Sequence, residues 1–419
     1  MSRVQGSSTR LRRGSHALIR DLNRAATLAM IGTQGPIARV EIARRLSLSA
    51  TTVTDVTRDL IADGLVRVVD QAASSGGRPP LLLGLVADAA HAIGVKIGPD
   101  RIAIVRVNLE GEILTRCHEA FDALAPDAID ALARRLRIEI DDGDGTRSLG
   151  IGLGVPGTVD AQLGSVEAPI LGWQHVALGQ TLRERLGLPI LIDNDVNTLA
   201  VAERLYGRGR VVDHFLTISI GRGVGLGIVV GGDVYRGFRG GAGEFGHLPV
   251  VEAGPLCECG MHGCLESLVA DPALVRQGIE DGLLAAGSSV RDGIERLCAL
   301  ADEGNPLARA IYGRAGAILG RAVAGLVNVL SPQVVIMSGE GVQAWEHIAE
   351  AFSSALRGAT FPSLRDVVVE VDPWDDDATW ARGAAALVLS ATFAAPLYER
   401  QIEDTVRARL SAFPRAAAS

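Results

Sequence analysis

The sequence predicts an α/β protein in which an N-terminal winged helix-turn-helix is followed by a body of two lobes. Two observations support this fold class. Residues 36–85 have the pattern of two short helices around a tight turn, followed by a hairpin. From about Leu85 onward strands and helices alternate, which is typical of α/β folds. The chain has 419 residues, enough for two or three domains.

The helix-turn-helix begins with a helix predicted over about 40–46 and a tight turn at Ser47–Ser49. A second helix is predicted to follow Ser49, because serine is a favoured N-cap residue. Its predicted end is Asp63, since Gly64 is a strong C-terminal stop. This second, polar helix is the candidate recognition helix.

The two faces of the second helix differ in chemistry. Val53, Val56 and Leu60 recur at helical spacing and predict a buried face. The hairpin that follows has a glycine-rich tip carrying an arginine, which can reach a phosphate or a minor groove. The predicted DNA contacts are therefore the polar face and the wing tip: Ser49, Thr51, Thr52, Asp55, Arg58 and Arg78.

The charge of the chain is divided unevenly. Residues 1–84 hold twelve arginines and six acidic residues, a net charge of +6. The remainder must then carry −14 to give the total of −8. A basic head on an acidic body predicts a double-stranded DNA partner for the head. A solvated charged face, or a winged helix used only for protein contacts, is the alternative.

The body opens with three predicted strands in residues 91–120, joined at Gly98–Asp100 and at the Glu110–Gly111 turn. A helix over about 127–140 and a buried strand over 148–157 come next. A further strand and helix meet near Val196. Residues 221–246 then contain 11 glycines, a composition that suits a phosphate-binding hairpin or plain strand corners.

Four potential metal ligands lie close together in the sequence. The spacing His247-x9-Cys257-x-Cys259-x4-Cys264 offers one imidazole and three thiolates, a set suited to a closed structural zinc site. Coincidence is the alternative. With four protein ligands no position is left for water, so the metal is expected to organise a loop. The remaining cysteines, Cys117 and Cys298, are predicted to lie in a strand and a helix as core residues.

The N-terminal stretch is rich in arginine but lacks the apolar run of a signal peptide. No window approaches 18 uninterrupted apolar residues, the length expected of a membrane span. The sequence therefore predicts a cytoplasmic protein with no membrane partner.

Several segments together resemble the ROK family, which comprises repressors, uncharacterised open reading frames and sugar kinases. Besides the helix-turn-helix they are IDNDVN at 192–197, GEFGH at 243–247, CECGMHGCLE at 257–266 and PQVVIMSGEG at 332–341. The resemblance covers about residues 25–389. It implies a two-lobed actin-like ATPase/sugar-kinase body with a sugar bound between its lobes.

The resemblance also implies domains and site residues. The domains would be a head at 1–86, a small lobe at 87–197 and a large lobe with the zinc site at 198–383, with a C-terminal helix at 384–400 packing on the small lobe. Asp195 would be the general base if the chain is a kinase. The expected sugar ligands are Asn194, Asp195, Glu244, His247 and Glu266, since carboxylates and amides suit sugar hydroxyls. One nitrogen of His247 would bind zinc while the other faces the sugar.

The nucleotide half of the kinase motif departs from the family pattern. Kinases of the family begin it with Asp-x-Gly-Gly-Thr-Lys, where this chain has KIGPDR at 96–101. Lys96 replaces the metal-binding aspartate, and Pro99 removes a backbone N–H that a phosphate needs. Arg222 stands where the kinases commonly have threonine. We therefore expect ATP and Mg²⁺ to be unlikely cofactors, and we expect Lys96 to pair with Asp195.

These features predict a sugar-responsive transcriptional regulator, a repressor that acts on an operator with an inverted repeat as a homodimer or homotetramer. Its zinc would be structural and its effector a sugar or sugar derivative. A sugar kinase with a DNA-binding head is one alternative. A regulator whose body docks a protein partner is another, although such a surface has no need of all five predicted sugar ligands.

Overall fold

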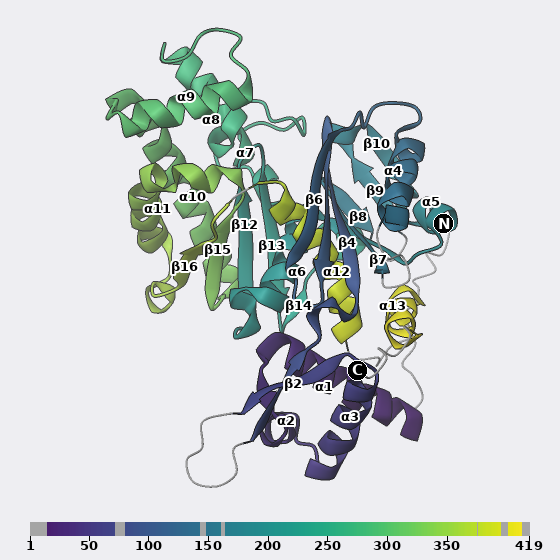
Figure 1. Cartoon of the computed structure of the whole chain (residues 1–419). Coiled ribbons are helices and arrows are strands. Elements are labelled where there is room, and N and C mark those ends of the chain that lie inside the picture. The colour runs from purple at the N-terminus through teal and green to yellow at the C-terminus, as the bar shows by residue number, and fades with distance from the viewer. Residues whose placement is uncertain are drawn as a thin grey trace, which may run out of the picture. The chain divides into compact units, whose positions relative to one another are not determined.

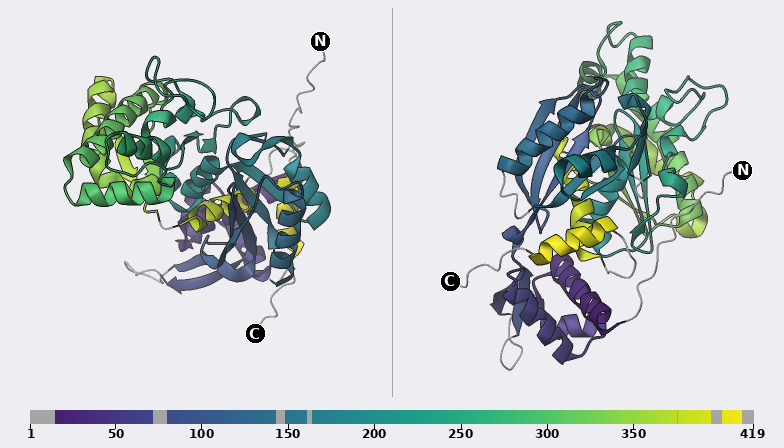
Figure 2. Two further views of the ribbon diagram at one scale, coloured as in Figure 1. Left: turned by 90° about the horizontal axis from the view of Figure 1, so that it is seen from above. Right: turned by 90° about the vertical axis from the view of Figure 1, so that its right-hand side faces the viewer.

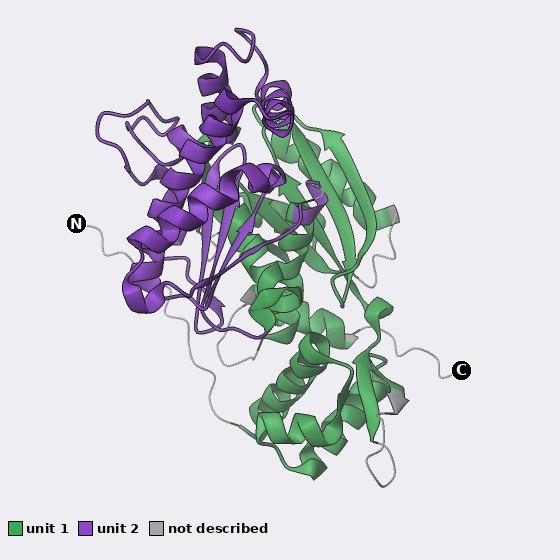
Figure 3. Cartoon of the chain, turned by 90° about the vertical axis from the view of Figure 1, so that its left-hand side faces the viewer, with its two compact units in different colours: residues 1–210, 380–419 green, residues 211–379 purple. Residues whose placement is uncertain are grey.

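The computed structural model describes residues 15–71, 80–142, 148–160, 164–374, 376–394 and 401–412. The chain forms two compact units, coloured separately in Figure 3. Unit 1 comprises residues 1–210 and 380–419, and unit 2 comprises residues 211–379.

The head of unit 1 is a three-helix bundle with a small sheet (Figure 1). The predicted helices and hairpin are confirmed, and a long preceding helix with a short strand joins them. The elements are α1 (His16–Gln34), β1 (Ile37–Ala38), α2 (Arg39–Leu46), α3 (Ala50–Ala62), β2 (Val66–Gln71) and β3 (Leu81–Leu85). The sheet order is β1-β3-β2, and both neighbouring pairs are antiparallel.

Helix α3 is bounded as its sequence predicts. The Ser49 hydroxyl accepts a hydrogen bond from the Thr52 N–H, so it caps the helix N-terminus. Gly64 has a φ of +72°, a conformation that glycine adopts without strain. Val53 and Leu60 are fully buried, which confirms the predicted core face. The opposite face of α3 is exposed to solvent.

The body of unit 1 is built on a five-stranded sheet in the order β11-β7-β4-β5-β6. The strands β4, β5 and β6 form an antiparallel meander, whereas β7 and β11 run parallel to β4 and to each other. The bounds are β4 (His91–Ile97), β5 (Arg101–Asn108), β6 (Ile113–Ala120), β7 (Ser148–Val155) and β11 (Ile190–Asn194). This topology brings the chain to the start of α6 (Asp195–Tyr206) directly from the carboxyl end of β11.

Helices cover both faces of this sheet (Figure 1). A core of aliphatic residues joins one face to α4 (Ala128–Asp142) and α5 (Leu178–Leu186). The other face meets α12 (Ala378–Phe393) at two glycines, Gly94 and Gly152. A Cβ at either glycine would come within 2 Å of a carbonyl oxygen of α12, at 1.9 Å and 1.8 Å respectively, so only glycine permits this packing.

Unit 1 also contains a small sheet and a last helix. A three-stranded sheet is formed by β8 (Thr158–Asp160), β9 (Ser165–Ala168) and β10 (Trp173–Val176). The last helix, α13 (Gln401–Ala412), lies beside β7 (Figure 2). There the Arg409 side chain donates a hydrogen bond to the Ser148 carbonyl. The predicted domain boundaries at 197 and 383 fall inside α6 and α12, whereas the two units divide after residues 210 and 379. Residues 395–400 of the predicted C-terminal helix lie outside the described residues.

Unit 2 is a second five-stranded sheet, in the order β14-β13-β12-β15-β16. Its strands are β12 (Phe215–Ile220), β13 (Val224–Val230), β14 (Asp233–Val234), β15 (Val334–Ser338) and β16 (Val368–Val371). One face is covered by helices, as Figure 1 shows. They are α7 (Glu266–Val269), α8 (Asp271–Glu280), α9 (Val290–Asp302), α10 (Pro306–Leu330) and α11 (Trp345–Ala359).

Helix α10 is apolar because it is the central helix of this layer. By length and composition it is the one described helix that could cross a membrane, but 56% of its apolar window is buried inside the protein. Its buried side chains pack against the sheet and against α11. Core packing therefore accounts for its hydropathy.

Candidate functional site

The predicted site residues fall into separate groups, which the structure places in different units. Thr51 and its neighbours lie on α3 of the head, and Asn194 and Asp195 lie where β11 meets α6 in unit 1. The potential metal ligands and the remaining predicted sugar ligands, Glu244 and Glu266, lie in unit 2. Each group is described within its own unit.

The polar face of α3 is available to solvent. Thr51, Asp55 and Arg58 are exposed, and the Arg58 guanidinium lies 2.9 Å from the Asp55 carboxylate. Thr52 is half-buried, and its hydroxyl lies 2.8 Å from the Ser49 hydroxyl, so both take part in the helix cap. Arg78 lies outside the described residues.

Asn194 holds the start of α6. Its side-chain oxygen accepts hydrogen bonds from the Val196 and Asn197 N–H groups, at 2.9 Å and 3.3 Å. Its amide nitrogen donates to the Gly157 carbonyl at 3.0 Å. The side chain thus ties the helix N-terminus to the loop that follows β7.

Asp195, the first residue of α6, forms an ion pair with Lys96, which confirms the predicted pairing. Lys96 lies on β4 at a position that shares a sheet face with Gly94, the face that α12 covers. The Lys96 ammonium lies 4.6 Å from the centre of the Trp380 ring, a cation–π contact with the same helix. Both charged side chains are mostly buried, at 17% and 13% exposed.

The four potential metal ligands come together in unit 2. The ligand atoms of His247, Cys257, Cys259 and Cys264 all lie within 4.8 Å of one another. The Cys257 sulfur is 3.5 Å from His247 Nδ1, and the Cys259 and Cys264 sulfurs are 3.7 Å apart. A tetrahedral zinc with Zn–S bonds of about 2.3 Å would place two sulfurs about 3.7–3.8 Å apart. The residues therefore fit a metal ion of this kind.

The folded loop explains how these ligands converge. Pro249 pairs with Cys264 and Leu256 with His262 in two isolated antiparallel bridges, which close the loop onto itself. Burial raises the pKa of the Cys257 thiol to about 12, and burial followed by the Cys259 thiol raises that of Cys264. A raised pKa means that deprotonating these thiols is unfavourable. A bound divalent cation would offset that cost by stabilising the thiolates.

Two predicted sugar ligands flank the cluster. His247 turns Nδ1 to the cysteines, so its other nitrogen, Nε2, lies 3.9 Å from the exposed Glu244 carboxylate. One Glu266 oxygen accepts the Val224 N–H at 2.9 Å, and the other lies 4.0 Å from the Cys257 sulfur. The imidazole can therefore serve a metal on one side and a polar ligand on the other.

The hairpin loop at Gly221–Gly223 has a partner that sequence reasoning missed. Glu340, the first residue of the short helix η7 (Glu340–Ala344), accepts the Arg222 N–H at 2.9 Å. Its carboxyl carbon would lie 2.3 Å from a Cβ at Gly221, so any side chain at this position would require the Glu340 carboxylate to move. The sequence signal was an acidic residue between two glycines after a buried strand, SGEG.

A second carboxyl group adjoins this loop. The Asp271 N–H donates to the Gly221 carbonyl at 2.8 Å. Burial, followed by the negative charge of Glu340, raises the pKa of the Asp271 carboxyl to about 7. Glu266 and Glu340 place two carboxyl groups beside the loop, an arrangement that is unfavourable for a phosphate.

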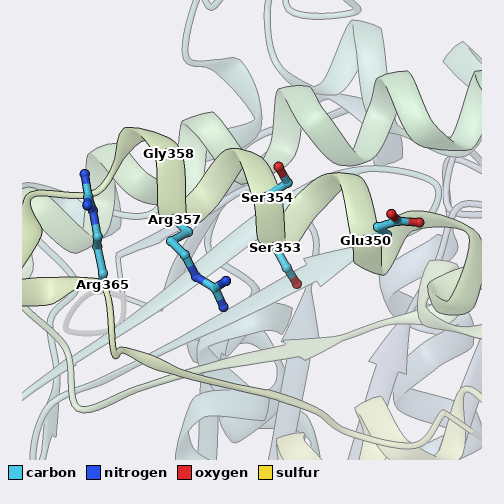
Figure 4. Close-up of a pocket in the computed structure, with 6 residues that line it drawn as sticks. All are labelled: Glu350, Ser353, Ser354, Arg357, Gly358 and Arg365. Atoms are coloured by element: carbon cyan, nitrogen blue, oxygen red, sulfur yellow. The ribbon is translucent and has the colours of Figure 1, made fainter.

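A hollow on the surface of unit 2 contains none of the predicted site residues (Figure 4). It runs along α11 and is lined by Glu350, Ser353, Ser354, Arg357, Gly358 and Arg365. The candidate sites are therefore defined by their side-chain clusters and not by this hollow.

Two family models match this chain, one over the body and one over the head. A family model described as ROK family matches residues 92–391, and one described as MarR family matches residues 22–71.

Relatives match nearly the full length. The xylose repressor of Caldicellulosiruptor bescii is 30% identical over 400 residues, which cover 92% of this chain and 100% of the relative. The DNA-binding transcriptional dual regulator NagC of Escherichia coli strain K12 is 30% identical over 410 residues, which cover 93% and 98%. A solved ROK family transcriptional regulator, a homolog of the E. coli MLC protein, superimposes with a TM-score of 0.78 at 26% identity, covering 94% of this chain and 99% of that one.

Proposed function

Because this chain belongs to the ROK family, we propose that it is a transcriptional repressor whose body binds a sugar effector without phosphorylating it. The observation that carries the proposal is the ion pair between Lys96 and Asp195. The carboxylate that would act as general base in a kinase is already engaged by an ammonium group. The winged helix-turn-helix head would bind DNA and so control transcription.

For the head, we propose binding to a double-stranded operator in the bacterial cytoplasm. The exposed Thr51, Asp55 and Arg58 would face the major groove. A protein that binds as a dimer would require an inverted repeat with half-sites about one helical turn apart, or a multiple of it. A homodimer or homotetramer supplies this symmetry.

For the body, the proposed effector is a sugar or sugar derivative. In support of this proposal, the relative from Caldicellulosiruptor bescii is named a xylose repressor, and xylose is a sugar. The predicted ligands in unit 2 are two carboxylates and an imidazole, groups that can bind vicinal hydroxyls in fixed planes. The proposed zinc would be structural, held by His247 and the three cysteines of its loop. It would supply no reacting group, because four protein ligands complete its shell.

The alternative function is a sugar kinase, and two further features argue against ATP and Mg²⁺ as cofactors. Pro99 lacks the N–H that a phosphate would accept. At the second loop, Glu340 already accepts the Arg222 N–H and presents a negative charge there. A phosphate would have to displace a carboxylate from both the hydrogen bond and the space beside Gly221.

The DNA-binding role is tested with an operator selected from random duplexes by the full chain. Thr51→Ala is expected to lose preference at one base position, because a base contact contributes about 1–3 kcal/mol, or about 5- to 150-fold in affinity. Arg58→Ala is expected to weaken binding across sequences and to reduce its salt dependence. Fluorescence anisotropy at several salt concentrations measures both effects.

A matched control is Arg276→Ala, which removes a partly exposed arginine from α8 of unit 2. It should leave operator affinity unchanged. If Thr51→Ala and Arg58→Ala also bind like the unaltered chain, α3 is not the recognition helix.

A further inference from the structure

A second group of potential metal ligands lies in unit 2, in addition to the cysteine-rich loop. The ligand atoms of Cys298, Asp302 and His347 all lie within 4.8 Å of one another. They combine a sulfur, a carboxylate oxygen and an imidazole nitrogen. Cys298, predicted to be a core residue, is half-buried and packs against the hydrophobic core of unit 2, and Cys117 is also half-buried.

The three side chains come from two helices. Cys298 and Asp302 stand four residues apart on α9, so they project from the same face. His347 lies in the first turn of α11, and its Nε2 is 2.7 Å from Asp302 Oδ1. The neighbouring Glu346 carboxylate lies 3.7 Å from the same nitrogen. A hydrogen bond between the two helices needs only His347 and Asp302, so it does not account for the positions of Cys298 and Glu346.

A buried polar group next to the cluster is unsatisfied. The hydroxyl of Tyr312 has no hydrogen-bond partner among the described residues, although Tyr312 is only 1% exposed. Its ring lies against the His347 imidazole, with 5.7 Å between ring centres. A buried hydroxyl without a partner is costly, and a metal-bound water would supply one.

We propose that Cys298, Asp302 and His347 form a binding site for a divalent transition-metal ion of the zinc class. The mixed sulfur, nitrogen and oxygen set suits zinc and its close neighbours and disfavours magnesium or calcium. The exposed Glu346 carboxylate or a water completes the shell. The site links the end of α9 to the start of α11.

Binding requires only a small rearrangement. With bonds of about 2.0–2.2 Å in a tetrahedron, the histidine nitrogen and the carboxylate oxygen stand about 3.3–3.5 Å apart. Their present separation of 2.7 Å must therefore widen. The Asp302 side chain is 54% exposed and is free to turn, whereas His347 is held at 10% exposure.

The proposal is tested by counting metal ions on the full chain. Protein stripped with a chelator is dialysed against Zn²⁺, and bound ions are counted by native mass spectrometry. We expect two zinc ions on the unaltered chain and one on Cys298→Ser or His347→Ala. Asp302→Asn should weaken the second equivalent by about tenfold or more. Cys117→Ser, a cysteine change on β6, is the matched control and should keep two.

The outcomes separate the two sites. A chain that binds one zinc and loses it in Cys298→Ser supports the present site and refutes the zinc in the cysteine-rich loop. A chain that binds one zinc and keeps it in Cys298→Ser overturns the present site alone. Circular dichroism in chelator shows whether each variant is folded, and Asp302→Asn provides the answer should Cys298→Ser or His347→Ala fail to fold.

Discussion

Cys259→Ser is expected to abolish zinc binding at the cysteine-rich loop and, with it, binding of the sugar effector. Cys259 is exposed, so the substitution removes a ligand with little direct loss of core packing. The loop places His247 beside Glu244 and Cys257 beside Glu266, and without the metal these side chains lose their common anchor. Metal analysis measures the first effect, and a thermal-shift screen against a panel of sugars measures the second.

Cys117→Ser is again the control, since it should retain both zinc and the stabilisation by sugar. If metal-free protein or Cys259→Ser binds sugar at full stoichiometry and affinity, the metal does not scaffold the sugar site. The screen also identifies the effector, because only a ligand that binds the folded state raises the unfolding temperature.

Removing one partner of the Lys96–Asp195 pair should destabilise unit 1 strongly. Asp195→Ala leaves an ammonium group that is 17% exposed without its counter-charge. Losing one partner of a buried pair costs about 3–5 kcal/mol, and the partial exposure here reduces the expected value to about 2–3 kcal/mol. Urea unfolding monitored by tryptophan fluorescence measures the loss, and Trp380, beside Lys96, is a local probe.

A double-mutant cycle separates pairing from other effects. Lys96→Met together with Asp195→Ala should be more stable than Asp195→Ala alone, because no charge is then left unpaired. If the losses of the two single variants simply add in the double variant, the two side chains do not stabilise each other, and the pair cannot be the reason that Asp195 is withheld from catalysis.

Local signals in the sequence were enough to predict much of the fold. The cap at Ser49 and the turn at Gly64 bound α3 because both act within a few residues. The turns of the β4–β6 meander were predicted in the same way. In contrast, the packing of a C-terminal helix on the small lobe was expected only from the family resemblance, because α12 packs on the sheet through Gly94 and Gly152, which lie over 200 residues away in the chain. No local pattern carries such a contact.

The candidate sites also differ in how far apart their residues lie in the sequence, and this decides how each was predicted. The cysteine-rich cluster was predicted because its four ligands lie within one short stretch. The Lys96–Asp195 pair was predicted through a family resemblance, since 99 residues separate the partners. Glu340 was missed because its role depends on the parallel pairing of β12 with β15, which brings residues 118 positions apart into contact. Cys298 and His347 are likewise joined only by helix packing.

The central claim, a sugar sensor without kinase activity, is tested most directly by one titration. The full chain, bound to its selected operator, receives the effector sugar with Mg-ATP while operator anisotropy and ADP release are recorded together. The account predicts at least a tenfold change in operator affinity, equivalent to about 1.4 kcal/mol, with ADP release at background. ADP release at about 1–100 per second, the ordinary range for kinases, or an operator complex indifferent to every sugar that binds, would contradict it.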